Sequence, residues 1–480
     1  MNLAIDVERS AARYPDSIAI RARETLNYQD FLQAVREVSG GLRNLGVSPG
    51  DPVLYSLQNG AATTILFYSI LHAGAIAVPT NPLLSQSEFA DIRGRVGPCL
   101  TVSDGADRGT DILLTEADEF QALPHGKANY PAACVGPTDP AVVFFTSGTT
   151  GRAKGVVLSH QNLSTNADWV ATRSLSPLQW GPAFASGVIL PLSHSFALTC
   201  SQNAAIRSGA AVAPLARFNG PECLEYIRRH EVTVTALVPS AAKSLVEAWR
   251  EDDGPVPLRT CMIGGAPIDS ELIGQVEACL GATVVEGYGL TETSPVCAFR
   301  SLGTPRKPGS VGRVAGYAKL GLRTENGIET TGTGELAVQG PGVFERYLDS
   351  PTTERHGEWF MTGDVATIDD DGDVFIVDRL KDMIIRNGYN VSPVEVERSL
   401  ATFPGVLDAG VVGIADPNVG EEIAAFLVLE RGDCLPPGLN PEAVGLSKYK
   451  WPRRFEFVSE IPRGTKGQVL RGRLKSQILT

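Results

Sequence analysis

The sequence predicts an α/β fold: a large N-terminal domain of layered α/β subdomains with a small β-rich subdomain, followed by a smaller, mobile α+β C-terminal domain. Helical and strand-like segments alternate through residues 28–286, and short alternating strands follow from Gly334. The chain of 480 residues is also longer than one hydrophobic core normally supports. Two or three domains are therefore expected.

The first part of the chain is expected to form parallel sheets covered on both faces, because its strand-like segments are continuously apolar. The apolar stretch 61–78 contains Thr63, Ser69 and His72, so a buried helix passing into a strand is favoured over a membrane span. The expected helices are 28–45, 88–95, 221–229 and 241–249, and the expected strands are 52–56, 100–103, 187–190, 232–238, 260–263 and 283–286.

The later part of the chain predicts the domain limits. We expect an N-terminal domain over residues 1–380, with the β-rich subdomain at about 310–380, and a C-terminal domain over 381–480 that hinges near Lys381. The elements that predict these limits are strands 335–338 and 374–377 with the turn 369–372, helix 394–400, strands 406–413 and 424–429, and a rigid surface turn over 435–441.

Composition restricts the possible partners and compartments. The formal net charge is −12 with the basic residues dispersed, which argues against a nucleic-acid surface. The eight cysteines are scattered and form no CxxC pair, which predicts core thiols of a reducing cytoplasm. The N-terminus carries charges where a signal peptide needs apolar residues, so no signal peptide is expected. No membrane partner is expected either.

The most informative motif is the Gly/Thr/Ser loop of residues 144–159. Its glycines allow the backbone to approach a ligand, and its amides and hydroxyls can donate to phosphate oxygens while Lys154 adds a charge. It is not a Walker A loop, because Gly155 stands where that motif needs Ser or Thr. Taken alone, the loop is equally compatible with a hydroxyl-rich hairpin turn.

Four motifs together carry a family resemblance. The loop 146–155, Glu286–Ser294, Trp359–Asp364 and Asp378–Asn390 resemble, in order and spacing, the signatures of the adenylate-forming superfamily, which includes acyl-CoA synthetases, peptide-synthetase adenylation domains and luciferases. The resemblance covers essentially the whole chain. It implies ATP and Mg²⁺ as cofactors and an acyl-AMP intermediate.

The resemblance also implies roles for individual residues. It makes Glu292 the Mg²⁺ ligand, Thr291 a contact of the α-phosphate, and Asp364 and Arg379 the ribose contacts; without it, Glu292 would be a solvated loop charge and Asp364 a turn residue. The remaining implied nucleotide contacts are Thr146, Ser147, Gly148, Thr149, Thr150, Gly151 and Lys154 for the phosphates, Gly264, Gly265 and Ala266 for the adenine, and Glu286, Gly287, Tyr288, Gly388 and Tyr389.

The segment 191–198 occupies the place of the family's acid-binding pocket, and His194 resembles its gating histidine; a lone histidine in an apolar segment is otherwise more often a core residue. Amino-acid-activating relatives have an aspartate here, whereas this segment has no acid. That favours an aliphatic or aromatic acid without an α-ammonium. Residues 238–240 and 264–266 are further pocket candidates, and the 386–397 motif resembles CoA ligases, which makes CoA the expected acceptor.

One position departs from the family pattern. In residues 461–471 the catalytic lysine position holds Gln468, and an amide cannot supply the lysine's charge. Lys466 lies two residues earlier and would point the same way in an extended loop, so it is the candidate replacement. The alternatives are a slow enzyme, or one whose unusual acid or acceptor makes the lysine dispensable.

The sequence therefore predicts an ATP- and Mg²⁺-dependent acid–CoA ligase. The alternatives are an adenylating enzyme with another acid or acceptor, such as a nitrite-activating diazotase or an amide-forming or carrier-protein ligase, and a nucleotide-binding pseudoenzyme. Acid-dependent release of pyrophosphate, with and without CoA, separates them.

Overall fold

The computed structural model describes most of the 480-residue chain. The described residues are 2–104, 110–114, 120–146, 153–175, 178–350, 355–380, 382–386, 389–416, 419–432, 434–446, 448–464 and 467–478.

The chain folds into two compact units. The first comprises Met1–Leu320 and Val338–Phe360, and the second comprises Gly321–Ala337 and Met361–Thr480. Residues 338–360 thus group with the first unit, and the first part of the predicted β-rich subdomain is divided between the two. The hinge near Lys381 remains a prediction, because Lys381 lies outside the described residues.

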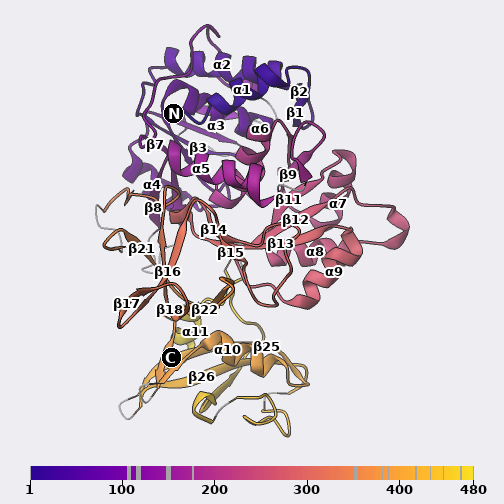
Figure 1. Ribbon diagram of the computed structural model, residues 1–480, viewed down its shortest axis with the longest axis vertical. Coiled ribbons are helices and arrows are strands. Elements are labelled where there is room, and N and C mark those ends of the chain that lie inside the picture. The colour runs from indigo at the N-terminus through magenta and orange to yellow at the C-terminus, as the bar shows by residue number, and fades with distance from the viewer. Residues whose placement is uncertain are drawn as a thin grey trace. The chain divides into compact units, whose positions relative to one another are not determined.

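The first unit contains a nine-stranded sheet with the order β15-β14-β13-β12-β11-β9-β10-β1-β2 (Figure 1). Its six central strands are parallel, as their continuous apolar sequences predict, whereas β2 pairs antiparallel with β1, β14 with β13, and β15 with β14. The strands are β1 (Ile18–Arg21), β2 (Thr25–Asn27), β9 (Ala185–Val188), β10 (Ala211–Pro214), β11 (Val234–Leu237), β12 (Thr260–Gly264), β13 (Thr283–Gly289), β14 (Val296–Phe299) and β15 (Arg313–Val314).

A seven-stranded sheet in the same unit has the order β19-β8-β7-β4-β3-β5-β6. Strands β7, β4, β3, β5 and β6 are parallel, whereas β7 and β8 form an antiparallel hairpin around residues 147–153. The strands are β3 (Pro52–Ser56), β4 (Ile76–Pro79), β5 (Leu100–Asp104), β6 (Ile112–Leu114), β7 (Pro140–Thr146), β8 (Lys154–Ser159) and β19 (Arg346–Tyr347).

Helices cover these sheets. Helix α3 is buried along its whole length and passes into β4, as predicted for residues 61–78, and no described helix is long and apolar enough to cross a membrane. The helices of this unit are α1 (Ile5–Arg13), α2 (Tyr28–Asn44), α3 (Ala61–Ala73), α4 (Gln86–Val96), α5 (His160–Trp169), α6 (Ala204–Ser208), α7 (Gly220–Arg229), α8 (Pro239–Ala248) and α9 (Ser270–Leu280), with short helical turns at Phe120–Ala122, Val170–Ser174, Ala197–Asn203, Glu251–Asp253 and Thr291–Thr293.

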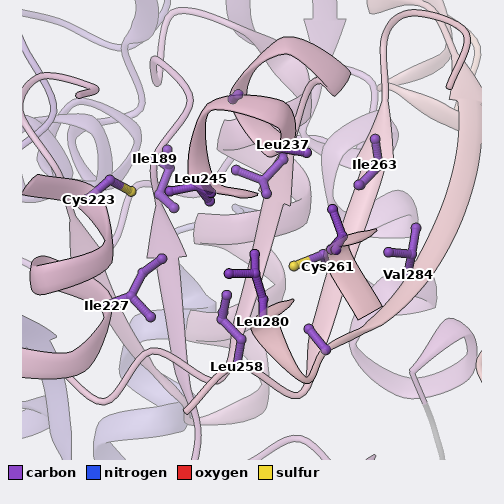
Figure 2. Packing of buried hydrophobic residues seen from close by; sticks show 14 of the residues in the cluster. Ile189, Cys223, Ile227, Leu237, Leu245, Leu258, Cys261, Ile263, Leu280 and Val284 are labelled. Carbon is purple, nitrogen blue, oxygen red and sulfur yellow. The ribbon is translucent and has the colours of Figure 1, made fainter. Parts of the chain in front are cut away.

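The core beneath α7, α8 and α9 holds the strands that end at the candidate site. Ile227 of α7, Leu245 of α8 and Leu280 of α9 are fully or almost fully buried against β11, β12 and β13 (Figure 2). Burying a side chain of this size stabilises the fold by roughly 1.5–3 kcal/mol. This packing fixes the ends of β12 and β13, from which the adenine and metal motifs extend.

The second unit contains most of a six-stranded sheet and a separate five-stranded sheet. In the latter, β25 and β26 form a long antiparallel pair on which α10 and α11 pack, with Val396 and Leu474 buried. The elements are β16 (Lys319–Thr324), β17 (Gly327–Glu329), β18 (Gly332–Gln339), β20 (Arg355–His356), β21 (Trp359–Ile368) and β22 (Val374–Arg379) in the first sheet, and β23 (Ile384–Arg386), β24 (Tyr389–Val391), α10 (Pro393–Ala401), β25 (Val406–Asp416), β26 (Gly420–Leu429), a helical turn at Lys448–Lys450, β27 (Arg454–Phe457) and α11 (Arg471–Ile478).

Two expectations need correction. The cysteines are not all core thiols, since Cys99, Cys134 and Cys434 are exposed while Cys200 and three others are buried. The predicted surface turn 435–441 is only partly at the surface, because Leu439 is buried in the core of the second unit. Leu439, which stands between Pro437 and Pro441, packs in the same core as the buried side chains of α10 and β25.

Candidate active site

The phosphate-loop motif begins and ends on a β-hairpin. Thr146 closes β7 and Lys154 opens β8, and the two residues are paired across the hairpin, with the Thr146 hydroxyl 3.5 Å from the carbonyl oxygen of Lys154. The hairpin fixes the stem of the loop. Ser147, Gly148, Thr149, Thr150 and Gly151, which are predicted to hold phosphates, lie outside the described residues.

Lys154 faces an aromatic ring that the sequence analysis did not single out. Its Nζ lies 4.9 Å from the centre of the Tyr347 ring, and Tyr347 is on β19, which pairs with β8. Gly155 has to be a glycine for packing, because a Cβ there would come within 2.9 Å of the Leu348 Cβ. Gly155 therefore allows β19 to pack against β8, in addition to its predicted role in the phosphate loop.

Glu292 lies in a helical turn (Thr291–Thr293) directly after β13. Its backbone carbonyl accepts a hydrogen bond from the Phe344 amide at 2.9 Å, and its Oε1 accepts one from the Tyr347 hydroxyl at 3.1 Å. The Thr293 hydroxyl accepts from the Leu290 amide at 2.9 Å and caps the turn. The predicted metal ligand and the predicted phosphate lysine thus share Tyr347 as a neighbour.

The predicted acid-binding segment contacts the same turn. The Ser195 hydroxyl lies 3.5 Å from the Thr291 hydroxyl, and the Leu192 amide donates to Asn59 Oδ1 at 2.9 Å. His194 lies within this segment, whose first turn is closed by its own amide donating to the Pro191 carbonyl at 2.9 Å. The segment then continues as the buried helical turn Ala197–Asn203.

The adenine motif lies at the carboxyl end of β12. Gly264 is in register with Gly287 of β13, and a Cβ on Gly264 would come within 2.8 Å of the Gly287 carbonyl oxygen and 3.7 Å of the Phe196 ring. Gly265 has a φ of +82°, which glycine adopts readily, and its Cβ position faces Val238 at 3.6 Å. Phe196 of the segment 191–198, Val238 of the segment 238–240 and the glycines of the segment 264–266 thus lie close together. Ala266 is the residue after Gly265 in the chain.

Glu286, one of the predicted nucleotide contacts, has a buried side chain that pairs with an arginine. The side chain is buried and lies 3.3 Å from the Arg306 guanidinium, which also binds Glu277 at 2.8 Å. Burial raises the pKa of Glu286, and the positive charge of Arg306 opposes that rise. A role in nucleotide binding would therefore use the backbone of Glu286 rather than its carboxylate. Tyr288 follows Gly287 on the same strand, paired with Ala298.

The two predicted ribose contacts are neighbours in the second unit. Asp364 on β21 is in register with Arg379 on β22, and the guanidinium lies 3.4 Å from the Asp364 carboxylate. The Asp364 amide donates to the Thr362 hydroxyl at 3.1 Å, and Gly363 has a φ of +72°. This turn presents a buried carboxylate beside an exposed guanidinium. Gly388 and the side chain of Tyr389 lie outside the described residues.

The C-terminal motif is a tight hairpin rather than an extended loop. The Gly464 amide donates to the Gln468 carbonyl, the Gly467 amide donates to the Gly464 carbonyl, both at 2.8 Å, and Gly467 has a φ of +84°. The Gln468 side chain folds over Gly464. Lys466 is expected to point the same way as Gln468 only where the loop is extended, because side chains alternate regularly only in an extended strand, and its direction remains a prediction. Lys466 lies outside the described residues.

The described residues contain no group of three or more His, Cys, Asp or Glu side chains arranged to hold a metal ion. A single carboxylate with nucleotide phosphate oxygens is instead the donor set that suits Mg²⁺. Glu292 fits this role, since Tyr347 fixes its orientation through one oxygen atom. No softer metal is indicated by these donors.

Comparison with known proteins identifies the class. Residues 7–348 match the family model described as AMP-binding enzyme, and residues 395–468 match the model for the C-terminal domain of that enzyme family. The first match covers more than half of the chain, so the chain belongs to the AMP-binding enzyme family. The predicted resemblance to the adenylate-forming superfamily and the predicted fold class are confirmed.

The relatives within that family are CoA ligases and synthetases. The chain is 30% identical to 4-coumarate–CoA ligase 2 of Oryza sativa subsp. japonica, over 98% of this chain and 91% of that one, and 32% identical to feruloyl-CoA synthase of an Amycolatopsis species, over 97% of both chains. O-succinylbenzoate coenzyme A synthetase (MenE) from Bacillus subtilis, solved with ATP and magnesium ion, superposes with a TM-score of 0.85 at 26% identity, over 98% of both chains.

Proposed function

We propose that this protein is an AMP-forming acid–CoA ligase that uses ATP and Mg²⁺. In the first step, a carboxylate oxygen of the acid attacks the α-phosphorus of ATP, the acyl-AMP forms, and pyrophosphate leaves. In the second step, the CoA thiolate attacks the acyl carbon, the thioester forms, and AMP leaves. Catalysis of such transfers depends on positioning and on neutralising the developing charge.

The observation that carries the proposal is the position of the turn Thr291–Thr293. The acid segment contacts Thr291 through Ser195, while the hairpin of the phosphate loop approaches Glu292 through Tyr347. An acid held by the 191–198 segment and phosphates held by the loop would therefore both lie close to this turn. Thr291 is suited to donate to the α-phosphate, and Glu292 to hold Mg²⁺, whose charge stabilises the leaving pyrophosphate.

The side chains of the predicted pocket segments favour an acid without an α-ammonium. Phe196 and Val238 lie beside the glycines of the adenine motif, and the segment 191–198 offers no carboxylate to an ammonium. The named relatives act on 4-coumarate and on feruloyl groups, which supports testing hydroxycinnamate-type acids first and aliphatic acids second.

CoA is the proposed acceptor because of the 386–397 motif and the relatives. Gln468 at the lysine position supports two alternatives. One is a ligase with a different acid or acceptor, including nitrite as the acid, and the other is a nucleotide-binding pseudoenzyme. A reducing cytoplasmic location and the absence of nucleic-acid and membrane partners remain predictions from composition.

The deciding experiment measures pyrophosphate release by the full chain with Mg-ATP and a panel of hydroxycinnamic, benzoic and fatty acids, and with nitrite. Mass spectrometry of the products with and without CoA follows. An acyl-CoA and AMP support the proposal. Formation of an adenylate that is not transferred to CoA supports a different acceptor. Nucleotide binding without pyrophosphate release for any acid of the panel supports the pseudoenzyme.

A further inference from the structure

Tyr347 connects two predicted ligand-binding groups that are far apart in the sequence. Its ring lies over the Lys154 Nζ at 4.9 Å, and its hydroxyl donates to Glu292 Oε1 at 3.1 Å. Lys154 opens β8, Glu292 follows β13, and Tyr347 is on β19. One side chain therefore contacts both the phosphate-loop lysine and the proposed metal ligand.

The backbone on both sides of Tyr347 is anchored to these same segments. The Leu348 amide donates to the Gly155 carbonyl at 2.7 Å, and the Phe344 amide donates to the Glu292 carbonyl at 2.9 Å. The Phe344 and Tyr347 rings also pack edge to face, with centroids 4.7 Å apart. Because the chain is tied at 344 and 348, the ring of Tyr347 has little freedom between them.

The segment before Tyr347 is held from α5 as well. The Asn162 side-chain amide donates to the Pro341 carbonyl at 2.7 Å and to the Val343 carbonyl at 3.1 Å, and Asn162 itself forms the capping box of α5 with Ser159. The position of Tyr347 is thus set by β8, by α5 and by the turn at Glu292. Such support is what a residue needs to orient a neighbour to within a fraction of an ångström.

The two contacts have different chemical consequences. A hydroxyl that donates to Oε1 uses one of about four lone-pair sites of a carboxylate, so this hydrogen bond does not by itself prevent the carboxylate from coordinating a cation. An aromatic face attracts an ammonium without using an N–H donor, so it can hold the lysine while the amine donates to phosphate. Both contacts are compatible with a bound Mg-nucleotide.

We infer that Tyr347 is a positioning residue that orients Glu292 for Mg²⁺ and Lys154 for the nucleotide phosphates. The inference rests on the proposed function for the identity of the ligand. It assigns Tyr347 no contact with reacting atoms. It predicts that the hydroxyl group governs the dependence on Mg²⁺, whereas the ring governs the affinity for the phosphates.

The test measures equilibrium binding of α,β-methylene-ATP, whose α–β bridge cannot be cleaved, to the full chain at a series of Mg²⁺ concentrations. Tyr347→Phe should raise the Mg²⁺ concentration needed for half-maximal enhancement of binding by about tenfold, the loss expected for one hydrogen bond to a charged group, while binding without Mg²⁺ stays unchanged. Tyr347→Leu should also weaken binding without Mg²⁺, because it removes the ring.

The matched control is Tyr226→Phe. That tyrosine also donates hydrogen bonds through its hydroxyl, to the carbonyls of Arg21 and Pro214, and these acceptors lie on β1 and β10 rather than in the motifs of the candidate site. Thermal unfolding of each variant separates a loss of fold from a loss of positioning. In a Glu292→Gln background, Tyr347→Phe should cause no further change in the Mg²⁺ dependence.

An unchanged Mg²⁺ dependence in Tyr347→Phe, or a change no larger than in Tyr226→Phe, would overturn the inference. An additive effect in the Glu292→Gln background would overturn it as well. If the wild-type protein binds the analogue in an Mg²⁺-dependent way but releases no pyrophosphate with any acid, the proposed ligase activity fails while the role of Tyr347 still stands on the binding data.

Discussion

Gly264 and Gly287 lie directly opposite each other on β12 and β13, so closely that a Cβ on Gly264 would stand 2.8 Å from the Gly287 carbonyl oxygen. The two strands approach because neither residue has a side chain. The consequence is a flat backbone surface at the carboxyl ends of the strands, where ligands of parallel sheets usually bind.

Gly264→Ala should weaken nucleotide binding by about tenfold or more, because the backbone of β13 has to shift away from the added methyl group and moves the proposed adenine surface. Gly274→Ala is the control, since a Cβ there meets nothing within 4 Å and the residue lies in α9. Equilibrium binding of α,β-methylene-ATP measures both. Equal affinities for the two variants would contradict the assignment of this surface to adenine.

Glu292→Gln should lower the rate of pyrophosphate release by about 10²–10³-fold, because the amide keeps the size of the side chain but cannot supply the charge that Mg²⁺ requires. The fold should persist, since a glutamine oxygen can still accept from Tyr347. Steady-state pyrophosphate release and thermal unfolding test both statements. Glu247→Gln, on the exposed face of α8, is the control. Retained activity at an unchanged Mg²⁺ requirement would show that another group holds the metal.

α-Amino acids should be poor substrates. Burying an ammonium without a partner costs several kcal/mol, and the segment 191–198 provides no carboxylate. The informative comparison is between the best acid of the panel and its own α-amino derivative, for which kcat/KM should fall by about 10²-fold or more. Comparable pyrophosphate exchange with both compounds would place an unrecognised anion in the pocket.

The next question is which residue, if any, supplies the charge of the lysine that Gln468 replaces. If Lys466 supplies the charge, Lys466→Ala should slow adenylation by about 10²-fold, and Gln468→Ala should have little effect on it. Pre-steady-state formation of the adenylate measures the step directly. If Lys466→Ala is near neutral, Gln468→Lys becomes decisive: faster adenylation indicates a decayed site, and an unchanged or slower reaction indicates a site built around a different acid.

Acid should destabilise the protein partly through His160. This side chain is buried, its Nδ1 accepts a hydrogen bond from the Leu3 amide at 3.1 Å, and burial lowers its pKa from 6.5 to about 4. The contribution of neutral His160 to the free energy of unfolding is complete above about pH 6.5 and is lost as the pH falls to about 4. The loss amounts to about 3 kcal/mol.

The test compares the free energy of unfolding of the wild-type protein and His160→Asn between pH 7.5 and 4.5. Asparagine can accept from Leu3 and does not titrate, so the variant should lose less stability on acidification. His72, whose pKa burial also lowers to about 4, remains in both proteins and cancels in the comparison. Exposed His356→Asn is the control. Parallel pH profiles for His160→Asn and the wild type would exclude the assignment.

The predicted elements correspond closely to the structure where the sequence has a clear period. The predicted strand at 52–56 is β3, the helix at 28–45 is α2, and the helix at 394–400 is α10. Their apolar spacing and caps act locally, so a single sequence suffices. The helical turn Ala197–Asn203 was not predicted, because its irregular pitch has no apolar period of its own.

Contiguous motifs of glycines and acids single out Gly264 and Glu292 in the sequence, and the ligand contacts assigned to them remain predictions. Tyr347 was missed because its importance depends on pairing between β19 and β8, which are almost 190 residues apart in the chain. The backbone pairing of Gly464 with Gln468 was not predicted, because it accompanies a left-handed torsion at a single glycine, Gly467. Long-range pairing and single backbone torsions leave little trace in composition or spacing.

The packing of Gln468 over Gly464 restricts how this C-terminal motif can be altered. A Cβ at position 464 would come within 2.3 Å of the Gln468 Nε2, so a side chain at 464 requires the flexible end of the Gln468 side chain to move. An attempt to convert the protein to the usual lysine-bearing form should therefore keep glycine at 464 and replace only residue 468. Homologues in which residue 464 carries a side chain should have a smaller residue at 468, a side chain at 468 that turns away from 464, or a hairpin of different length.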